Sequence, residues 1–483
     1  MKFILPFCLL FSAISAFSQQ TPYQAFEVDS VAEPRGSMVY FNTFLQANLR
    51  KPITAEAQGI GGRVIVSGVV EPNGTITDVK VINKISPDCD REAARVFALF
   101  NAWKPAYKGG QAVRQLVSMP ILFRANEPFM YQNGVKIEFF NAEYKPLFAD
   151  SSQAIYKRIT PLDTNYIPTG DAVVYERKAG SWKEYFRLAF FRKKQAVPDS
   201  PTKSTYLIGT QTYKQDWVGP LLIVDEDTKR VSEEHYTNGK LIGSSLTYHP
   251  NGLVIKKVDD VDGKSTEIAW YANGQIKHIK TINKNRPLLE PERVTALWDS
   301  TGQQTLKNGT GRVIYKTREN SYSDTAQYTA FIEEGNYENG FKQGLWTGRY
   351  ADGSYYYEEL YDKGICQGGK AKSAKEDTVH YEEVLKEPQF PDGMPGLGKF
   401  LSSNLHYPSK AQKANVEGKV FISFVVCTDG TLCDYEVLKS VQQDLDAEAL
   451  RVVKKMSGKW LPGYHRGQKA RVKYNLPINF TLY

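Results

Sequence analysis

Few residues in this sequence combine the types and the spacing that chemistry needs. Cys427 and Cys433 are the clearest pair, because they flank residues 428–432, an Asp-Gly turn signal between two β-rich runs. A three- or five-residue loop register would place the two thiols directly opposite each other, where an oxidising compartment would permit a disulfide. A different register would leave two free buried thiols. Both alternatives are open at this stage.

The other polar clusters have structural explanations. The sequence has no G-x-S-x-G, H-E-x-x-H, C-x-x-C or Walker phosphate-binding motif. Three carboxylates, Asp444, Asp446 and Glu448, are typical of a helix start, where acidic side chains complement the helix dipole. The histidines flank predicted turns or lack a matching partner: His235, His249, His406 and His465. We therefore expect no catalytic residues, no enzyme activity, no metal site and no cofactor.

Composition places the chain among ordinary globular proteins. It has 483 residues, room for roughly three domains, with 41% hydrophobic and 24% charged residues. The net charge of +8 comes from 61 Lys and Arg and 53 Asp and Glu, and the two signs are interspersed. A nucleic-acid partner would need a clustered basic stripe, so we expect none. The 29 tyrosines and 12% aromatic residues favour β-rich structure.

The N-terminus has the pattern of a secretory signal. A charged start precedes an apolar run over residues 3–17, and the small residues Ala16 and Ser18 predict cleavage before Gln19, which gives a signal peptide of residues 1–18. The run is shorter than the roughly 20 apolar residues of a spanning helix. We expect a periplasmic protein, with retention of this segment as a membrane anchor as the alternative.

The two ends of the chain are copies of each other. Residues 44–102 align with residues 400–458 without a gap, and after one inserted residue the match continues to Pro120 and Pro477. Both copies contain an Asn-Leu pair before a proline, a Val-Val pair, a Gly-Thr turn, an Asp-x-Glu-Ala-x-Arg-Val run and a Trp-x-Pro motif. A register kept over this length marks two related domains.

Each copy has the pattern of a small α+β domain. In the second copy, the apolar spacing predicts a helix around residues 397–405 that ends before Pro408, and another helix over residues 444–456. The expected strands are residues 420–426, 434–438 and 471–483. The prediction is a three-stranded antiparallel sheet with two helices on one face, which leaves an exposed sheet edge.

A further set of motifs characterises the second copy. These are Pro388–Gly393, Tyr407-Pro408, Glu417–Val420, Asp429-Gly430, Glu448-Ala-x-Arg451 and Trp460-x-Pro462-Gly463. Together they resemble the TonB C-terminal domain family over residues 386–483. The first copy, residues 36–124, resembles the family more weakly, since Lys51 replaces the tyrosine before the proline and the Phe-Pro-x-Gly entry is missing. We interpret the first copy as a packing or spacer module.

The resemblance implies recognition of extended peptides. Domains of this family engage short peptides of outer-membrane receptors by strand addition and couple them to inner-membrane energy. Main-chain hydrogen bonds at an open sheet edge supply the affinity in that mode. By this resemblance the last strand is the expected edge: Arg471, Val472, Lys473, Tyr474, Asn475, Leu476, Ile478 and Phe480. The expected partners are outer-membrane TonB-dependent receptors or other envelope proteins.

The middle of the chain, residues 126–380, is polar, tyrosine-rich and punctuated by glycine. An aromatic residue shortly before Asn-Gly or Asp-Gly recurs, most clearly in residues 231–365. Such dipeptides favour the positive φ angles of tight hairpin turns. The pattern resembles the variant MORN repeats of antitoxin-like proteins and predicts a β-hairpin array. The fold class is therefore α+β and β, with two small domains flanking a hairpin-repeat region.

Two functions follow from this organisation. The first is an exported, non-enzymatic, TonB-like adaptor linked to transmembrane transport, because a Pro-rich span of the kind an energy transducer needs is missing from the sequence. The alternative is a structural envelope scaffold built on the hairpin repeats, with end domains that cap the array or form a homo-oligomer. No small-molecule substrate is evident in the sequence.

Overall fold

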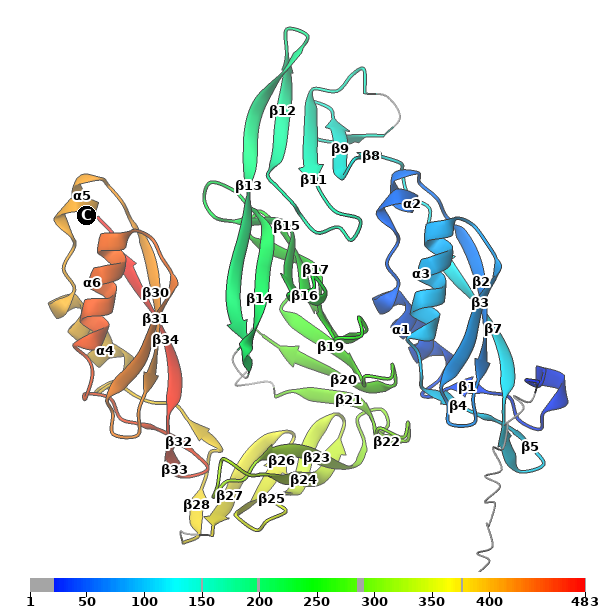
Figure 1. Ribbon diagram of the computed structural model, residues 1–483. Coiled ribbons are helices and arrows are strands. Elements are labelled where there is room, and N and C mark those ends of the chain that lie inside the picture. Colours follow the sequence, from blue (N-terminus) through cyan, green and yellow to red (C-terminus); the bar gives the residue numbers. More distant parts are fainter. Residues whose placement is uncertain (1–20, 149–150, 198–199, 285–290, 375–376, 483) are drawn as a thin grey trace, which may run out of the picture. The chain divides into compact units, whose positions relative to one another are not determined.

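The computed structural model describes residues 21–148, 151–197, 200–284, 291–374 and 377–482 (Figure 1). The predicted signal peptide, residues 1–18, lies outside these ranges. None of the helices within them combines the length and the apolar character needed to cross a bilayer. The chain divides into two compact units, one formed by residues 1–286 and 296–304 and the other by residues 287–295 and 305–483.

The first end domain lies in the first unit. Its main sheet has the order β3-β2-β7, with antiparallel neighbours throughout, and Figure 1 shows α3 lying across one face of that sheet. The elements are η1 (Ala25–Glu27), β1 (Glu33–Pro34), α1 (Met38–Asn48), α2 (Ile53–Ala57), β2 (Gly62–Val70), β3 (Ile76–Asn83), α3 (Pro87–Ala98), β4 (Trp103–Lys104), β5 (Ala106–Lys108), β6 (Gln111–Val113) and β7 (Gln115–Phe123).

A long antiparallel meander follows and forms most of a 15-stranded sheet. The order is β10-β9-β11 and then β12 to β22 in sequence, with β8 paired to β9. The strands are β8 (Met130–Gln132), β9 (Val135–Phe140), β10 (Pro146–Leu147), β11 (Tyr156–Pro161), β12 (Ala172–Lys178), β13 (Ser181–Val197), β14 (Ser200–Gln211), β15 (Trp217–Val224), β16 (Arg230–Thr237), β17 (Lys240–Tyr248), β18 (Val254–Val261), β19 (Lys264–Trp270), β20 (Ile276–Asn283), β21 (Arg293–Trp298) and β22 (Gln304–Leu306).

The second unit begins with a six-stranded antiparallel meander, β23 to β28 in sequence order. Its strands are β23 (Gly311–Asn320), β24 (Tyr328–Glu338), β25 (Phe341–Tyr350), β26 (Tyr355–Asp362), β27 (Ile365–Ser373) and β28 (Val379–Tyr381). The chain as a whole is mostly β with few helices, which agrees with the β-rich prediction from its aromatic content.

The second end domain repeats the architecture of the first, with a sheet of order β31-β30-β34. Its elements are β29 (Leu385–Lys386), α4 (Gly393–Asn404), α5 (Ser409–Lys413), β30 (Gly418–Val426), β31 (Leu432–Lys439), α6 (Gln443–Lys454), β32 (Gly463–His465), β33 (Gln468–Ala470) and β34 (Val472–Phe480). The short helix α5 is an addition to the two predicted helices. It forms because Pro408, at its N-cap, suits a helix start as well as a helix stop.

Asn-Gly dipeptides close the hairpins at the predicted places. Asn238 and Gly239 join β16 to β17 with φ angles of 48° and 73°, and Asn339 and Gly340 join β24 to β25 with φ angles of 51° and 89°. Two successive positive φ angles are what a tight hairpin turn requires. The assignment of the region to MORN-type repeats stays a prediction.

In the first unit, the end domain and the array share one apolar core. Phe44 and Phe100 of the end domain are buried in the same cluster as Val254, Trp270 and Trp298 of the array. Phe44 and Phe100 also lie so close to Gly274 that a Cβ there would meet both rings at 3.0 Å. The first copy is therefore a packed part of the first unit.

The buried side-chain amide of Asn48 links the end domain to the array within this core. The Asn48 side-chain oxygen accepts a hydrogen bond of 2.7 Å from the Val254 backbone N–H, and its nitrogen donates to the Phe44 carbonyl at 2.9 Å. Asn48 is 1% exposed. In the second copy, Asn404 keeps the helix bond to the Phe400 carbonyl, at 2.8 Å, but its oxygen accepts from the exposed Lys455 ammonium instead.

These two asparagines provide a matched test of the shared core. We expect Asn48→Leu to destabilise the first unit by about 1–3 kcal/mol, because the Val254 N–H would be buried without a partner. Asn404→Leu loses the same helix bond but only an exposed ion–dipole contact, so its cost should stay below about 1 kcal/mol. Urea unfolding followed by hydrogen exchange of each unit measures both values. Equal losses at the two positions would contradict this role of Asn48.

Candidate functional site

The strand predicted to recognise a peptide lies at a sheet edge. β34 pairs with β30 along its whole length, from Val472 opposite Val426 to Phe480 opposite Gly418. Among the described residues, no strand pairs with its other side. The predicted site residues are therefore brought together in one edge strand, with Arg471 directly before it. Within it, Leu476, Ile478 and Phe480 are buried in the domain core, and Lys473 and Asn475 are exposed.

Pro477 fixes which backbone groups face the free side of β34. Proline has no N–H, so it occupies a paired strand without loss only where its nitrogen points away from the partner strand. Pro477 lies opposite Phe421 within the unbroken ladder to β30. Alternate residues share one direction in an antiparallel strand, so Lys473 and Asn475 also direct their backbone N–H groups to the free edge.

The first copy shows what that edge can bind. There, Tyr23 lies in a parallel bridge against Gln115 of β7, the counterpart of β34. The Tyr23 N–H donates to the Arg114 carbonyl, and the Leu116 N–H donates to the Tyr23 carbonyl, both at 2.9 Å. Leu116 aligns with Lys473, which agrees with the edge direction inferred from Pro477. A segment from elsewhere in the chain thus occupies the start of this edge in the first copy.

The two predicted disulfide cysteines lie beside the start of β34. The register places Cys433 opposite Val425, so the thiols are diagonal neighbours across the hairpin rather than directly opposite. Their sulfur atoms are 2.8 Å apart, and both residues are free thiols in this structure. Arg471 donates to the Cys433 sulfur at 3.3 Å. The hydrogen bond with Cys427, together with burial, raises the pKa of the Cys433 thiol against the opposing effect of Arg471.

In the first copy, the same two positions hold a carboxylate and a hydroxyl. Glu71 aligns with Cys427 and Thr77 with Cys433, and the Thr77 hydroxyl donates to Glu71 at 2.6 Å. Arg114, the counterpart of Arg471, forms an ion pair of 2.9 Å with Glu71. In both copies, side chains thus connect the end of the central strand to the neighbouring strand. The first copy uses an ion pair and a hydrogen bond, and the second has two adjacent sulfurs.

Asp444 and Asp446 lie in the first turn of α6, as predicted, whereas Glu448 lies in the middle of the helix, and all three carboxylates have structural partners. Glu448 accepts the His406 backbone N–H at 2.7 Å and an ion pair from Arg451 at 2.7 Å. Asp446 accepts the Val441 N–H at 3.1 Å, and Asp444 accepts from the Gln442 side chain at 3.1 Å. These contacts anchor the helix start to the preceding loops. Within the described ranges, no group of three or more His, Cys, Asp or Glu residues is placed to hold a metal ion.

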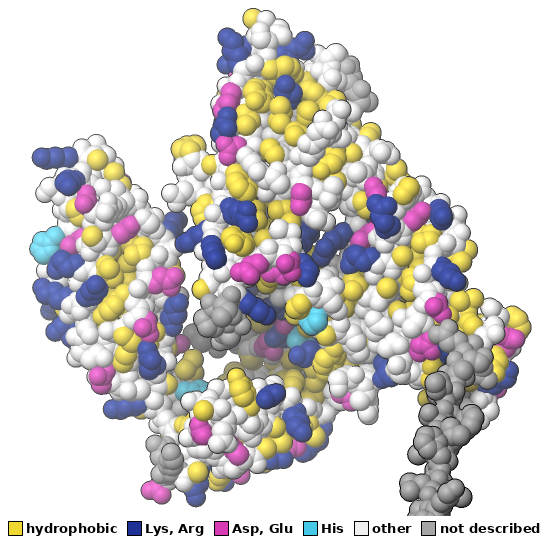
Figure 2. All heavy atoms as spheres, viewed as in Figure 1, with side chains coloured by type: hydrophobic (Ala, Val, Ile, Leu, Met, Phe, Trp, Pro, Cys, Tyr) yellow, Lys and Arg dark blue, Asp and Glu magenta, His cyan; other side chains and the backbone are white. Residues whose placement is uncertain are grey.

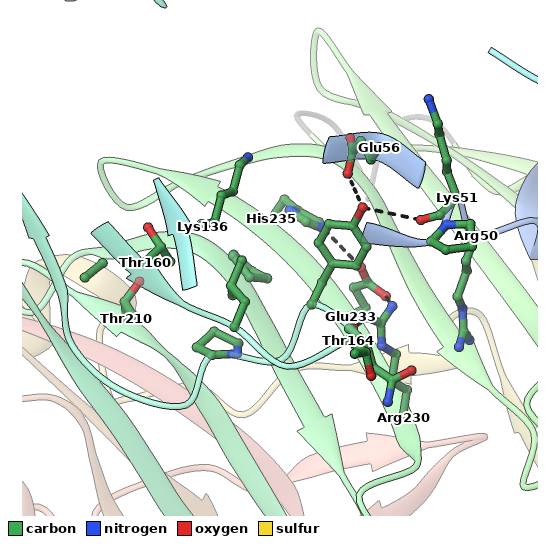
Figure 3. A pocket seen from close by; sticks show the side chains of 18 of the residues that line it. Arg50, Lys51, Glu56, Lys136, Thr160, Thr164, Thr210, Arg230, Glu233 and His235 are labelled. Atoms are coloured by element: carbon green, nitrogen blue, oxygen red, sulfur yellow. Dashed lines mark hydrogen bonds and ion pairs between the residues drawn. The ribbon is translucent and has the colours of Figure 1, made fainter. Parts of the chain in front are cut away.

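A cavity of about 610 Å³ lies in the first unit, between the end domain and the array (Figure 3). Tyr166 is one of its lining residues, and the Tyr166 hydroxyl donates to Glu56 and lies 3.3 Å from the Lys51 carbonyl oxygen. Glu233 lies on one wall, where it accepts from the Tyr248 hydroxyl at 2.8 Å and contacts His235 at 3.0 Å.

Glu233 is held ionised by these neighbours. Burial opposes the charge, but hydrogen bonds from His235 and Tyr248 and the charge of Arg230 lower the pKa of Glu233 to about 2. Burial and the adjacent Glu233 carboxylate raise the pKa of Tyr248 to about 12. His235 was interpreted from the sequence as a turn-flanking residue, and its part in this cavity was missed because strands β16 and β17 and the end domain meet only in the tertiary structure.

Comparisons with known proteins agree with the motif analysis at both ends. Residues 48–125 and 403–482 match the family model described as Gram-negative bacterial TonB protein C-terminal. Both end domains thus resemble TonB C-terminal domains in sequence. Two NMR solution structures of Helicobacter pylori TonB-CTD, residues 179–285 and 194–285, are similar at 27% identity; the matches cover 18% of this chain and 78% and 91% of those chains, with TM-scores of 0.16. No curated protein matches the chain.

The cysteines of the second end domain allow a direct test of the predicted disulfide. We expect oxidised glutathione to remove both thiols of the Cys427–Cys433 pair from alkylation, because the sulfurs are already adjacent and exchange needs only a small approach. Peptide mass spectrometry after trapping of free thiols measures this. In a Cys433→Ser variant, Cys427 should be recovered alkylated or glutathionylated. Full alkylation of both wild-type cysteines after oxidation would contradict the prediction.

Glu233 should make the first unit sensitive to acid. Its folded pKa of about 2 lies below the ordinary value of 4.5, so its stabilisation is present above about pH 4.5 and is lost as the pH falls towards 2. The difference corresponds to on the order of 3 kcal/mol. We expect the wild type to lose more stability than Glu233→Gln between about pH 6 and about pH 3, measured by urea unfolding. Parallel pH profiles for the two proteins would contradict this assignment.

Proposed function

We propose that the protein is an exported TonB-like component of envelope transport whose second end domain binds extended receptor peptides by strand addition along β34. The family match at both ends supports the envelope-transport assignment. The observation that carries the binding mode is the bridge in the first copy, where the Tyr23 backbone pairs with the start of the equivalent strand β7. Main-chain pairing of this kind supplies affinity, and exposed alternate side chains supply selectivity.

The two copies have different parts in this proposal. The first copy is buried against the array through Phe44 and Phe100, and the start of its β7 edge is already paired with Tyr23. It acts as a packing module. The second copy has the same strand order without a paired neighbour on β34 among the described residues, so it is the copy that recruits a partner. Its partners are outer-membrane receptors or other envelope proteins.

A structural scaffold role is the alternative function. A free β34 edge also suits pairing with the same strand of a second copy, which would make a homo-oligomer. Charge gives no reason to replace either function with nucleic-acid binding, since Figure 2 shows basic side chains beside acidic ones across the visible face.

A proline scan of the two edges tests the proposal. The full chain is titrated with a labelled peptide copied from the periplasm-facing N-terminal segment of an outer-membrane receptor. Asn475→Pro removes an outward N–H while leaving the ladder to β30 intact, so we expect binding to weaken about ten-fold or more. Asn475→Ala, which keeps the N–H, should change the affinity by less than about three-fold, because contacts are mainly through the backbone.

The matched control lies in the first copy. Ser118 aligns with Asn475 and is exposed on β7, so Ser118→Pro makes the same change at the other edge and should leave peptide binding unaltered. Equal loss in both proline variants, or none in Asn475→Pro, would contradict recognition by β34. Self-association that rises with concentration while the peptide has no effect would favour the scaffold.

A further inference from the structure

The cavity of the first unit is lined by more basic than acidic side chains. Three of its carboxylates are already used by neighbouring cations. Glu92 pairs with Arg95 at 2.6 Å, Glu138 pairs with Arg158 at 2.6 Å and with Lys136 at 3.1 Å, and Glu233 pairs with Arg230. The fourth, Glu56, accepts the Tyr166 hydroxyl. That hydroxyl is neutral, so Glu56 keeps its charge, and the lining as a whole carries six Lys and Arg side chains against four glutamates.

Arg50 and Lys51 supply the surplus charge. The Arg50 guanidinium stacks on the Tyr248 ring, 4.7 Å from its centroid, and no carboxylate among the described residues lies within ion-pair distance of it. Burial lowers the pKa of Arg50, and nearby Arg230 and Arg95 add to this effect against the opposing influence of Tyr248 and the Glu233 carboxylate. Within the described part of the chain, the Lys51 ammonium donates to two neutral oxygens, those of the Arg124 carbonyl and the Asn126 side chain, and forms no ion pair.

A second unsatisfied donor lies on the same wall. The Nε of Arg230 is buried and has no hydrogen-bond partner among the residues that the structure describes, although its terminal nitrogens bind Glu233 and the Asn165 carbonyl. Figure 3 shows Arg50, Arg230 and Glu233 on the same side of the cavity. The mostly buried Arg50 guanidinium, in contrast, has no ion pair among the described residues, which is unfavourable because buried charges are normally paired.

The internal repeat shows that this charge is specific to the first copy. The positions of Arg50 and Lys51 are occupied in the second copy by His406 and Tyr407. The Tyr407 hydroxyl donates to the Val416 carbonyl at 2.5 Å, and its ring packs against Phe480. The backbone bracket is unchanged, because the Arg50 N–H donates to Glu92 at 2.7 Å just as His406 does to Glu448. The two cations are therefore not needed to form the domain.

We propose that this cavity binds a small molecule carrying an oxyanion, a carboxylate or a phosphate, through the Arg50 guanidinium. Arginine suits this chemistry because its planar fork of donors matches both groups. The Nε of Arg230 offers a further donor on the same wall, and Lys51 adds positive charge at the rim. Leu162, Leu188 and Val218 provide apolar surface for the rest of the ligand. The volume of about 610 Å³ lies in the range of small-molecule sites.

The test uses the full chain, without any receptor peptide, and calorimetric titration at low salt. The probes are inorganic phosphate, citrate as a carboxylate, and glycerol as an uncharged control. We expect saturable binding of phosphate or citrate, and which of the two binds more tightly distinguishes the phosphate source from the carboxylate source. Arg50→Gln should weaken that binding about ten-fold or more, because it removes a charge-assisted hydrogen bond.

Two further variants keep the result interpretable. Arg63→Gln removes an equal charge from an exposed position of β2 and should leave the affinity unchanged. Thr164→Trp fills the cavity from its exposed rim without removing a charge, and it should also weaken binding if Arg50→Gln proves unstable. Absence of saturable binding to either anion, or equal affinities for wild type, Arg50→Gln and Thr164→Trp, would overturn the proposal. Neither result bears on peptide binding at β34.

Discussion

The first unit depends on the burial of one face of an end domain against the β-array. Phe44, Phe100 and Trp298 remove apolar surface from water there, and that burial brings the Val254 N–H away from solvent as well. A buried peptide N–H without a partner would offset much of the gain. Asn48 supplies that partner from the end of α1, so the apolar contact and the amide bond stabilise the interface together.

The two related domains share their internal contacts but differ in what their outer faces contact. Both copies hold the segment after their first helix against their second main helix with the same bracket, in which a glutamate accepts a backbone N–H and an arginine donates to the carbonyl of the equivalent asparagine. The bracket is internal to the domain and independent of what the outer face contacts. The outer face is free to differ: Asn48 meets Val254 in one copy, and Asn404 meets Lys455 in the other.

The sheet edges of the two copies, and the side chains beside these edges, also differ. β7 and β34 have equivalent registers and a proline at the same place, yet Tyr23 pairs only with β7 among the described residues. Next to these strands, Glu71 and Thr77 give way to Cys427 and Cys433. The Arg50-Lys51 pair likewise appears where the first copy adjoins the array. The differences at Asn48, at the β7 edge and at Arg50-Lys51 fall where the first copy meets the array or the Tyr23 segment, whereas the cysteine pair is a difference inside the domain.

Much of the fold is readable in the sequence because its signals are local. The apolar spacing of α6, the β-branched run of β30, the Asn-Gly turns and the repeated motifs depend on residues close in the chain, and the helices and strands of the second end domain formed where they were predicted. The free edge of a three-stranded sheet follows from the same patterns. The Cys427–Cys433 proximity was also accessible, although its diagonal register depends on the turn, in which the Cys427 N–H donates to the Thr431 carbonyl.

Only the tertiary structure reveals the cavity and the packing of the first copy against the array. Arg50, Tyr166 and Glu233 lie on three distant segments, and no periodicity or spacing relates them. Lys51 was visible as a departure from the family pattern, but its meaning required the array as a neighbour. Local patterns determine whether a segment is a helix or a strand. Long-range packing determines which faces are covered, which sheet edge remains free and which charged side chains are buried. For that reason the sequence alone determined the two domains and their order, and the structure determined which surface of each remains available to a partner.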